Sequence, residues 1–140
     1  MPFVIKFVED GKGVVFEGAG LLTEEELVMA RAACQSDPEA MLRAAFALVD
    51  LEHVSELRLD HEGVRRLVTI DQRLAKLAAG MTVAIVAPSD HTFGIARMWQ
   101  TLAEQTGWPI RIVRSRSEAE RWIDQMLGRE AKASDAPAQA

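Results

Sequence analysis

The sequence has one cysteine and no long apolar run, and each absence excludes a class of protein. A single thiol, Cys34, cannot form an internal disulfide or supply the ligands of a zinc finger. The apolar runs at 44–49 and 83–88 fall far short of the roughly 20 residues that cross a bilayer. The first residues lack the basic region and apolar stretch of a secretory signal. We therefore expect a soluble, cytoplasmic protein with no membrane span.

Positive charge is also scarce. The chain has 16 Lys and Arg residues against 21 Asp and Glu residues, which gives a net charge of −5. A negatively charged protein repels nucleic acids and anionic lipids, so we expect neither as a partner. The richest arginine stretch, 111–121, also contains Glu118 and Glu120 and is typical of a solvated surface.

The length and the apolar content are those of one globular domain. A chain of 140 residues can bury roughly 70% of its unfolded surface without staples. We assign residues 1–127 to this domain, in which Cys34 is expected to be a small buried apolar residue. Residues 128–140 are mostly Ala, Lys, Ser, Asp and Pro without an apolar period, which predicts a disordered tail.

The first third of the chain predicts a β-hairpin followed by a helix. Alternating apolar residues at 3–8 and 14–16 flank a turn at 10–13, and the glycines at 18–20 are expected to break the second strand. Thr23 and Glu26 form a capping-box pattern at the start of a helix over 24–35. Pro38 ends that helix because proline cannot continue it.

The remaining chain alternates strands with helices. The segments 44–49 and 81–87 are continuously apolar, which is typical of strands covered on both faces, and 110–113 is a further strand. Helices are predicted after Asp60, after Ser89 and after Ser115, whereas 51–59 is irregular. The order ββαβαβαβα with right-handed crossovers predicts an α/β fold, with a largely parallel sheet, packed helices and the hairpin at its margin.

Polar side chains gather where the predicted strands end. In a parallel sheet these ends share one edge, at which ligands tend to bind. The residues expected there are Asp50, Asp60, His61, Glu62, Gly63, Ser89, Asp90, His91, Arg114, Ser115 and Arg116. Polar residues at loop edges are also ordinary on such a fold. Phe93 lies near this edge, either as an exposed contact residue or in a second core layer, and a close backbone approach would explain Gly94 beside it.

No pattern supplies a catalytic centre, a cofactor site or a metal site. The glycines at 18 and 20 precede a helix that opens with three glutamates, which would repel a pyrophosphate. Ser89, Asp90 and His91 are consecutive and cannot align as a hydrolase triad. The histidines lack the spacing of helical metal ligands. We therefore expect a protein that is not an enzyme, and Asp71 is interpreted as the rim of an apolar helix stripe.

Two segments carry a resemblance to a known family. The stretches VDLEHVSELRLDHEGVRRL (49–67) and VAIVAPSDHTFGIARMWQ (83–100) resemble an uncharacterised branch of the small bacterial domains described as SpoIIAA-like or STAS/Sec14-like. The resemblance covers nearly all of residues 3–127 and implies the fold of anti-anti-sigma factors, a mixed sheet with helices on it.

The resemblance also marks a departure. In anti-anti-sigma factors a serine in an Asp-Ser-Ser-Gly segment is phosphorylated to switch partner binding, and the corresponding segment here is Asp60-His61-Glu62-Gly63. No hydroxyl residue occurs between Glu56 and Val68, so phosphorylation at that point is not expected. The carboxylate of Glu62 would imitate a phosphoserine only in part, because it carries less charge.

Two functions remain open. The first is a non-catalytic regulatory or protein-interaction module of the STAS/SpoIIAA type, with a protein partner at the polar edge. The alternative is a Sec14-like domain for a small hydrophobic ligand, suggested by an apolar content of 49% and by Met98 and Trp99 beside a buried strand. A homodimer is compatible with either. An apolar cavity near Trp99 would favour a ligand, and an exposed apolar patch would favour a protein.

Overall fold

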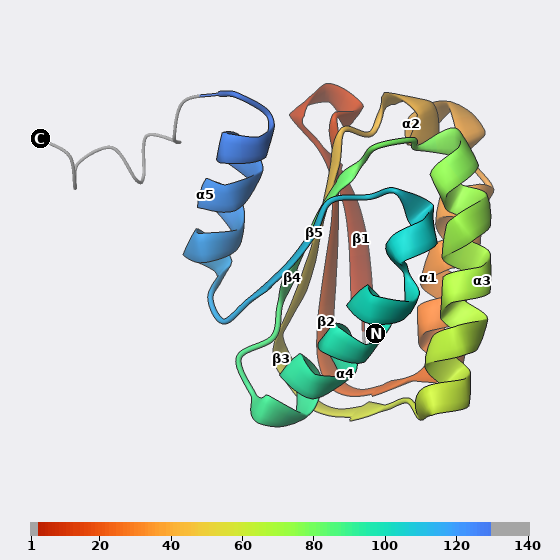
Figure 1. Ribbon diagram of the computed structural model, residues 1–140, viewed down its shortest axis with the longest axis vertical. Coiled ribbons are helices and arrows are strands. Elements are labelled where there is room, and N and C mark those ends of the chain that lie inside the picture. The colour runs from red at the N-terminus through yellow and green to blue at the C-terminus, as the bar shows by residue number, and fades with distance from the viewer. Residues whose placement is uncertain (1–2, 130–140) are drawn as a thin grey trace, which may run out of the picture.

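The computed structural model describes residues 3–129, which fold into a five-stranded sheet between two unequal helical layers (Figure 1). The strands, which lie in the sheet in chain order, are β1 (Phe3–Val8), β2 (Gly13–Thr23), β3 (Phe46–Arg58), β4 (Thr82–Val86) and β5 (Ile110–Val113). β1 is antiparallel to β2, and all the other neighbours are parallel. This arrangement confirms the predicted α/β class with a hairpin at the margin of the sheet.

The helices cover the two faces of the sheet unequally. They are α1 (Glu24–Gln35), α2 (Pro38–Arg43), α3 (His61–Leu77), α4 (Asp90–Leu102) and α5 (Arg116–Met126), with 3₁₀ turns η1 (Glu9–Gly11) and η2 (Glu104–Thr106). Figure 1 shows α5 alone on one face and the other helices on the opposite face. Each face has its own apolar core, and the core beneath α5 is the smaller one. Because both faces are covered, the central strands are apolar throughout, as predicted.

β2 is longer than expected. It runs through the glycines at 18–20 to Thr23, so the predicted strand break is wrong. The register against β3 shifts between Glu17 and Ala19 and again between Gly20 and Leu21, and Gly20 has a φ of +67°. The glycines therefore introduce bulges that bend the strand without ending it.

β3 also extends beyond its predicted end. The segment 51–58, expected to be irregular, continues the strand and pairs with the second half of β2, from His53 opposite Ala19 to Arg58 opposite Thr23. β4 ends at Val86, opposite Asp50, so this extension has a strand partner on one side only. Its burial does not alternate regularly, which left no period-2 signal to detect.

The helix starts follow their capping residues. Thr23 Oγ1 accepts from the amide of Glu26 at 3.3 Å, and Glu26 Oε1 accepts from the amide of Thr23 at 2.9 Å, so the predicted capping box is confirmed. The short helix α2 was not predicted, because Pro38 was interpreted only as a stop. Proline is equally suited to the first turn of a helix, and Asp37 caps this one through the amide of Ala40.

The expected tail begins within the described chain. Arg129 forms ion pairs with Glu9 and Asp124, each at 2.6 Å. Residues 130–140 of that predicted tail lie outside the described residues.

Candidate functional site

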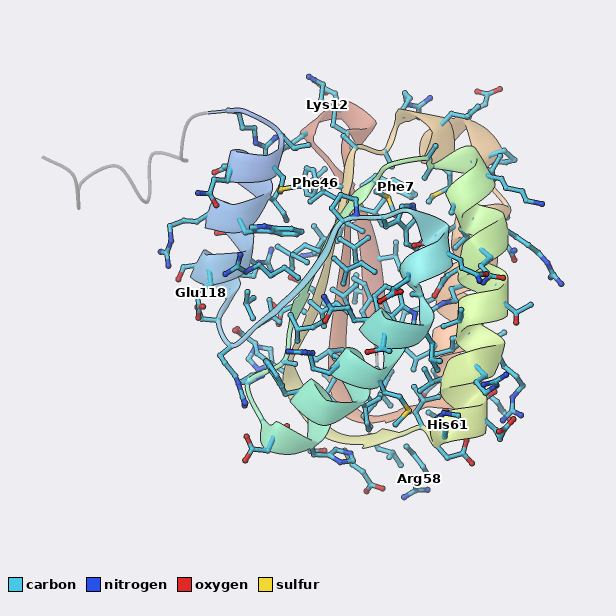
Figure 2. The ribbon with its side chains drawn as sticks, viewed as in Figure 1. Phe7, Lys12, Phe46, Arg58, His61 and Glu118 are labelled. Atoms are coloured by element: carbon cyan, nitrogen blue, oxygen red, sulfur yellow. The ribbon has the colours of Figure 1, made fainter. Side chains whose placement is uncertain are left out.

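The downstream ends of the parallel strands meet at one edge of the sheet. We call the surface formed there by residues 57–63, 88–93 and 114–115 the rim. Side-chain contacts connect its three segments, because His91 reaches the backbone of Leu57 and Arg114 reaches Asp90. In Figure 2, Arg58 and His61 lie at this end of the molecule, beside the start of α4. The expectation that these segments share an edge thus agrees with the sheet topology.

The first rim segment begins α3. Asp60 Oδ1 accepts from the amide of Gly63 at 2.7 Å and caps the helix. The side chains of His61 and Glu62 are 57% and 71% exposed. Gly63 is buried, and a Cβ there would lie 2.7 Å from Leu59 and 2.8 Å from Glu24. This segment therefore presents two exposed polar side chains above a glycine that no larger residue can replace without movement.

Glu24 joins the start of α1 to the start of α3, a contact that the sequence did not indicate. Arg66 donates to both carboxylate oxygens of Glu24, at 2.6 and 2.8 Å. The hydrogen bond from Arg66 holds the pKa of Glu24 below its usual range, although partial burial opposes it. The pair fixes the spacing of two helix N-termini beside the rim.

The second rim segment begins α4, and its polar side chains are used in structure. Ser89 Oγ accepts from the amide of Thr92 at 3.1 Å and so caps the helix. His91 Nε2 lies 3.0 Å from the carbonyl oxygen of Leu57 and 3.4 Å from its amide nitrogen, so it donates to one or accepts from the other according to its tautomer. His91 thereby covers part of the β3 edge that β4 leaves unpaired.

Arg114 completes the rim at the end of β5. Its Nη1 donates to the carbonyl of Pro88 at 3.0 Å and to Asp90 Oδ1 at 3.1 Å. Its guanidinium lies 4.0 Å from the centroid of the Phe93 ring. Phe93 is half-buried and packs against the main core, so the account of Phe93 as a flanking core residue fits the structure better than a fully exposed contact. Asp90 remains almost entirely exposed, at 99% of its side chain.

The expectation for Gly94 is wrong. No heavy atom lies within 4 Å of the position that a Cβ would occupy there, so no close backbone approach accounts for this glycine.

Two predicted edge residues lie away from the rim. Asp50 is a buried residue within β3, because the strand continues past it to Arg58. Its Oδ2 accepts from Arg116 Nη1 at 3.0 Å, and the same nitrogen donates to Glu17 at 3.0 Å. Hydrogen bonds from Lys6 and then from Arg116 lower the pKa of Glu17, although burial opposes them. Asp50 and Arg116 therefore attach α5 to the sheet. Ser115 caps α5 through the amide of Glu118.

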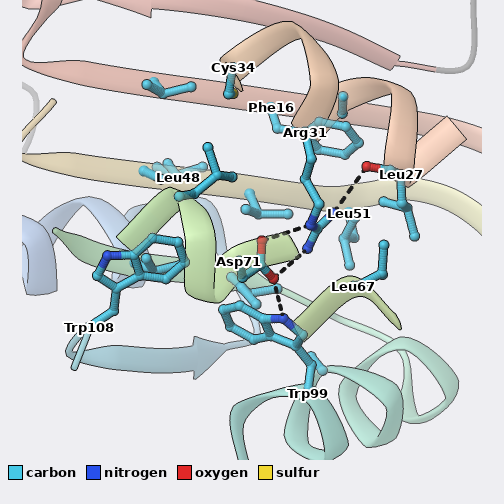
Figure 3. A pocket seen from close by; sticks show the side chains of 18 of the residues that line it. Phe16, Leu27, Arg31, Cys34, Leu48, Leu51, Leu67, Asp71, Trp99 and Trp108 are labelled. Atoms are coloured by element: carbon cyan, nitrogen blue, oxygen red, sulfur yellow. Dashed lines mark hydrogen bonds and ion pairs between the residues drawn. The ribbon is translucent and has the colours of Figure 1, made fainter. Parts of the chain in front are cut away.

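An apolar cavity of about 160 Å³ lies between the sheet and the larger helical layer (Figure 3). Residues of β1 to β4, of α1 to α4 and of the connections between elements line it, among them Phe16, Leu27, Cys34, Leu67, Trp99 and Trp108. Burial raises the pKa of the Cys34 thiol, which is therefore predominantly un-ionised at neutral pH.

One charged group, which we call the charged corner, lies in the otherwise apolar cavity lining and is formed by Asp71 and Arg31. Asp71 is 3% exposed, and Arg31 donates to both of its oxygens, at 2.8 and 3.1 Å. Trp99 Nε1 donates to Asp71 Oδ2 at 2.8 Å (Figure 3). Asp71 was expected to lie at the edge of an apolar helix stripe. This interpretation is wrong, because Asp71 lies in the core. A carboxylate within an apolar helical stripe was the available signal, because such a group is buried only with partners.

Two further features concern metals and membranes. Within residues 3–129, no three His, Cys, Asp or Glu side chains are grouped so as to hold a metal ion. None of the helices in that range is long and apolar enough to cross a membrane.

The topology and the helical layers define the class of domain. Four parallel strands with an antiparallel edge strand, helices on one face and a single helix on the other form a SpoIIAA-like fold. The predicted SpoIIAA/STAS-like domain is thereby confirmed at the level of fold.

Three solved structures show this likeness. The anti-sigma factor antagonist SpoIIAA in its unphosphorylated form is 21% identical, over 90% of this chain and 98% of that one, with a TM-score of 0.58. The phosphorylated form of SpoIIAA, a Bacillus cell fate determinant, is 18% identical over 89% and 98%, with a TM-score of 0.55.

An uncharacterised DUF3478-family protein with a SpoIIAA-like fold, from Shewanella loihica PV-4, is 20% identical over 86% of this chain and 91% of that one. Its TM-score is 0.51. No family model and no curated protein matches the chain.

Proposed function

We propose that this protein is a non-catalytic regulatory domain that binds a partner protein through the rim. The observation that supports the proposal is the convergence of three segments that are distant in sequence and carry exposed polar side chains. His61, Glu62 and Asp90 are 57%, 71% and 99% exposed. Their backbones are fixed by helix caps and by the His91 and Arg114 contacts, so binding orders little additional chain.

The contacts of the rim also favour binding over catalysis. Ser89 caps α4, and His91 contacts the backbone of β3 at Leu57. A hydrolytic site requires the serine and the histidine within hydrogen-bond reach of each other, with a third group to orient the base. These residues serve instead to shape the surface.

The comparison with SpoIIAA supports a regulatory role of this kind. That protein is described as an anti-sigma factor antagonist and as having phosphorylated and unphosphorylated forms. In the present chain Glu62 and His61 stand at the start of α3 without a hydroxyl group. We therefore propose a partner interaction that is set by fixed charge at this helix start and is not switched by phosphorylation there.

A photo-crosslinking amino acid at position 62 tests the proposal directly. In lysate of the native host, we expect a discrete protein adduct from position 62. The matched control is the same amino acid at Glu39, an exposed residue of α2, which lies at the opposite end of the molecule from the rim (Figure 1). Equal adducts from both positions, or none from position 62, would count against the rim as the binding surface.

The cavity favours a second candidate function, the binding of a small apolar ligand. Its lining is almost wholly apolar and includes Trp99, the residue expected to distinguish the two functions. Native mass spectrometry of freshly purified protein should then show a co-purifying mass, and the same spectrum reports any self-association. The variant Ala30→Leu/Ala96→Leu, which fills the cavity from two helices, should lose that mass. If the variant still carried the co-purifying mass, the ligand would be bound outside this cavity.

A further inference from the structure

The size of the cavity limits the ligand more strictly than its apolar character does. An engineered protein cavity of about 150 Å³, lined by Leu, Ile and Phe, stays dry and binds benzene. The cavity here is about 160 Å³. A molecule of one or two small rings matches this volume.

The lining favours aromatic ligands among small apolar molecules. Phe16, Trp99 and Trp108 contribute aromatic groups, and Cys34 and Met41 contribute sulfur atoms. Ring edges and faces attract one another beyond the area they bury, and sulfur contacts ring edges favourably. An aromatic ring therefore gains contacts in this cavity that an aliphatic molecule of equal volume does not.

The charged corner adds one polar requirement. An ionised carboxylate offers about four lone-pair positions. Asp71 uses three of them, two for Arg31 and one for Trp99. Asp71 also lines the cavity. Its fourth lone pair can therefore accept a hydrogen bond from a ligand N–H or O–H. A ligand with a carboxylate of its own would bring a like charge to Asp71 in an apolar space, which is costly.

We propose that the cavity binds a neutral aromatic molecule of one or two rings that carries a single hydrogen-bond donor, the class of phenol and indole. This inference rests on the second candidate function, the apolar-ligand site. The donor bonds to Asp71, while the ring occupies the space between the sheet and Trp99. Arg31, which donates to both carboxylate oxygens, holds the carboxylate in position for this bond.

Calorimetric titration of the full chain with matched ligands tests the inference without altering Asp71. Indole and benzofuran have nearly the same shape, but benzofuran has no N–H to donate. A hydrogen bond to a charged group is expected to make indole bind about tenfold more tightly or better. The variant Ala30→Leu/Ala96→Leu should lose indole binding, whereas Ala33→Leu, at an exposed position of α1, should keep it.

Two further probes separate the failure of this inference from the failure of the apolar-ligand function. Equal affinity for indole and benzofuran would overturn the role of Asp71. Binding of dodecanoate without indole would leave an apolar-ligand site but reject the ligand class. If neither these ligands nor xenon, followed by ¹²⁹Xe NMR, interacts with the wild-type cavity, both the inference and the function that it rests on are wrong.

Discussion

Asp71 holds three helices together through its two oxygens. Arg31 approaches from α1 and Trp99 from α4, while Asp71 itself is on α3. A buried ion pair adds little stability relative to well-packed apolar residues, but removing one partner leaves the other charge uncompensated. Such a residue contributes more to the unique arrangement of its neighbours than to net stability.

The substitution Asp71→Asn should therefore be strongly destabilising. The Arg31 side chain is still 19% exposed, so part of its charge would remain solvated. We therefore expect the free energy of unfolding to fall by about 2–4 kcal/mol, toward the lower end of the range for buried pairs. Urea unfolding measures it. The control is Glu56→Gln, which removes the exposed Arg58–Glu56 pair and should cost less than about 1 kcal/mol. Comparable losses in the two variants would show that the buried network has no special role.

Two glycines should respond in opposite directions to the same substitution. A Cβ on Gly13 would overlap the ring of Phe46, so Gly13→Ala should cost about 1–3 kcal/mol through overpacking. Nothing lies within 4 Å of a Cβ on Gly94, which is in α4, so Gly94→Ala should stabilise by up to about 1 kcal/mol. Thermal unfolding of both variants measures the difference, and a stabilising change at Gly13 would contradict the packing described here.

The contact between Glu24 and Arg66 predicts a pH dependence. The folded protein lowers the pKa of Glu24 below its unfolded value. The contribution of this carboxylate to stability is therefore complete above the unfolded pKa and is lost as the pH falls through the folded pKa. An NMR titration of the Glu24 carboxyl carbon should give a lowered pKa that returns toward normal in Arg66→Gln. An unchanged titration in that variant would assign the shift to another cause.

At the scale of elements, α5 is distinct because, within residues 3–129, no other helix covers its face of the sheet (Figure 1). Ala119 and Ile123 pack into the smaller apolar core. Arg116 adds ion pairs to Asp50 and Glu17 in the sheet. The buried carboxylate of Asp50 depends on that guanidinium. The position of α5 is consequently fixed by the ion pairs of Arg116 as well as by a small core.

Replacement of Arg116 should loosen α5 more than the rest of the fold. Arg116→Met leaves Asp50 buried without its cation, and we expect a loss of about 2–3 kcal/mol. Amide hydrogen exchange should accelerate in α5 before it does in α3. Adding Asp50→Asn to the variant should recover part of the loss, and a strictly additive double variant would mean that the two residues do not interact.

The same elements show how far the sequence alone could predict the structure. Continuous apolar segments and the Thr23–Glu26 pattern located the central strands and a helix start, because burial on both faces and capping have local signatures. The extension of β3 and the inward position of Asp50 had no such signature. They depend on the pairing of β2 with β3 across bulges, which is a tertiary property.

The candidate site also has a part that the sequence could predict and a part that it could not. The shared edge of the helix starts followed from parallel topology, so Asp60 and Asp90 could both be assigned to that edge in advance. The contacts of Arg66 with Glu24 and of Arg31 with Asp71 join residues 42 and 40 positions apart, and no periodicity predicts them. The cavity likewise depends on how α1 to α4 pack over the sheet.

At the scale of the whole molecule, two candidate sites occupy different parts of one fold. The rim is a polar surface at the downstream edge of the sheet, and the cavity lies between the sheet and the larger helical layer. α4 contributes to both, with Asp90 at its start and Trp99 within the core. Of the two, the rim is the surface that we propose recognises a protein partner.

Affinity purification from native lysate with two charge-reversed proteins tests that claim most directly. The double variant Glu62→Arg/Asp90→Arg changes two exposed rim residues, and Glu39→Arg changes an exposed residue of α2 as the control. The account predicts a partner that the wild type and the Glu39→Arg protein retain and the rim variant loses. A partner retained equally by all three proteins, or no partner for the wild type, would contradict it.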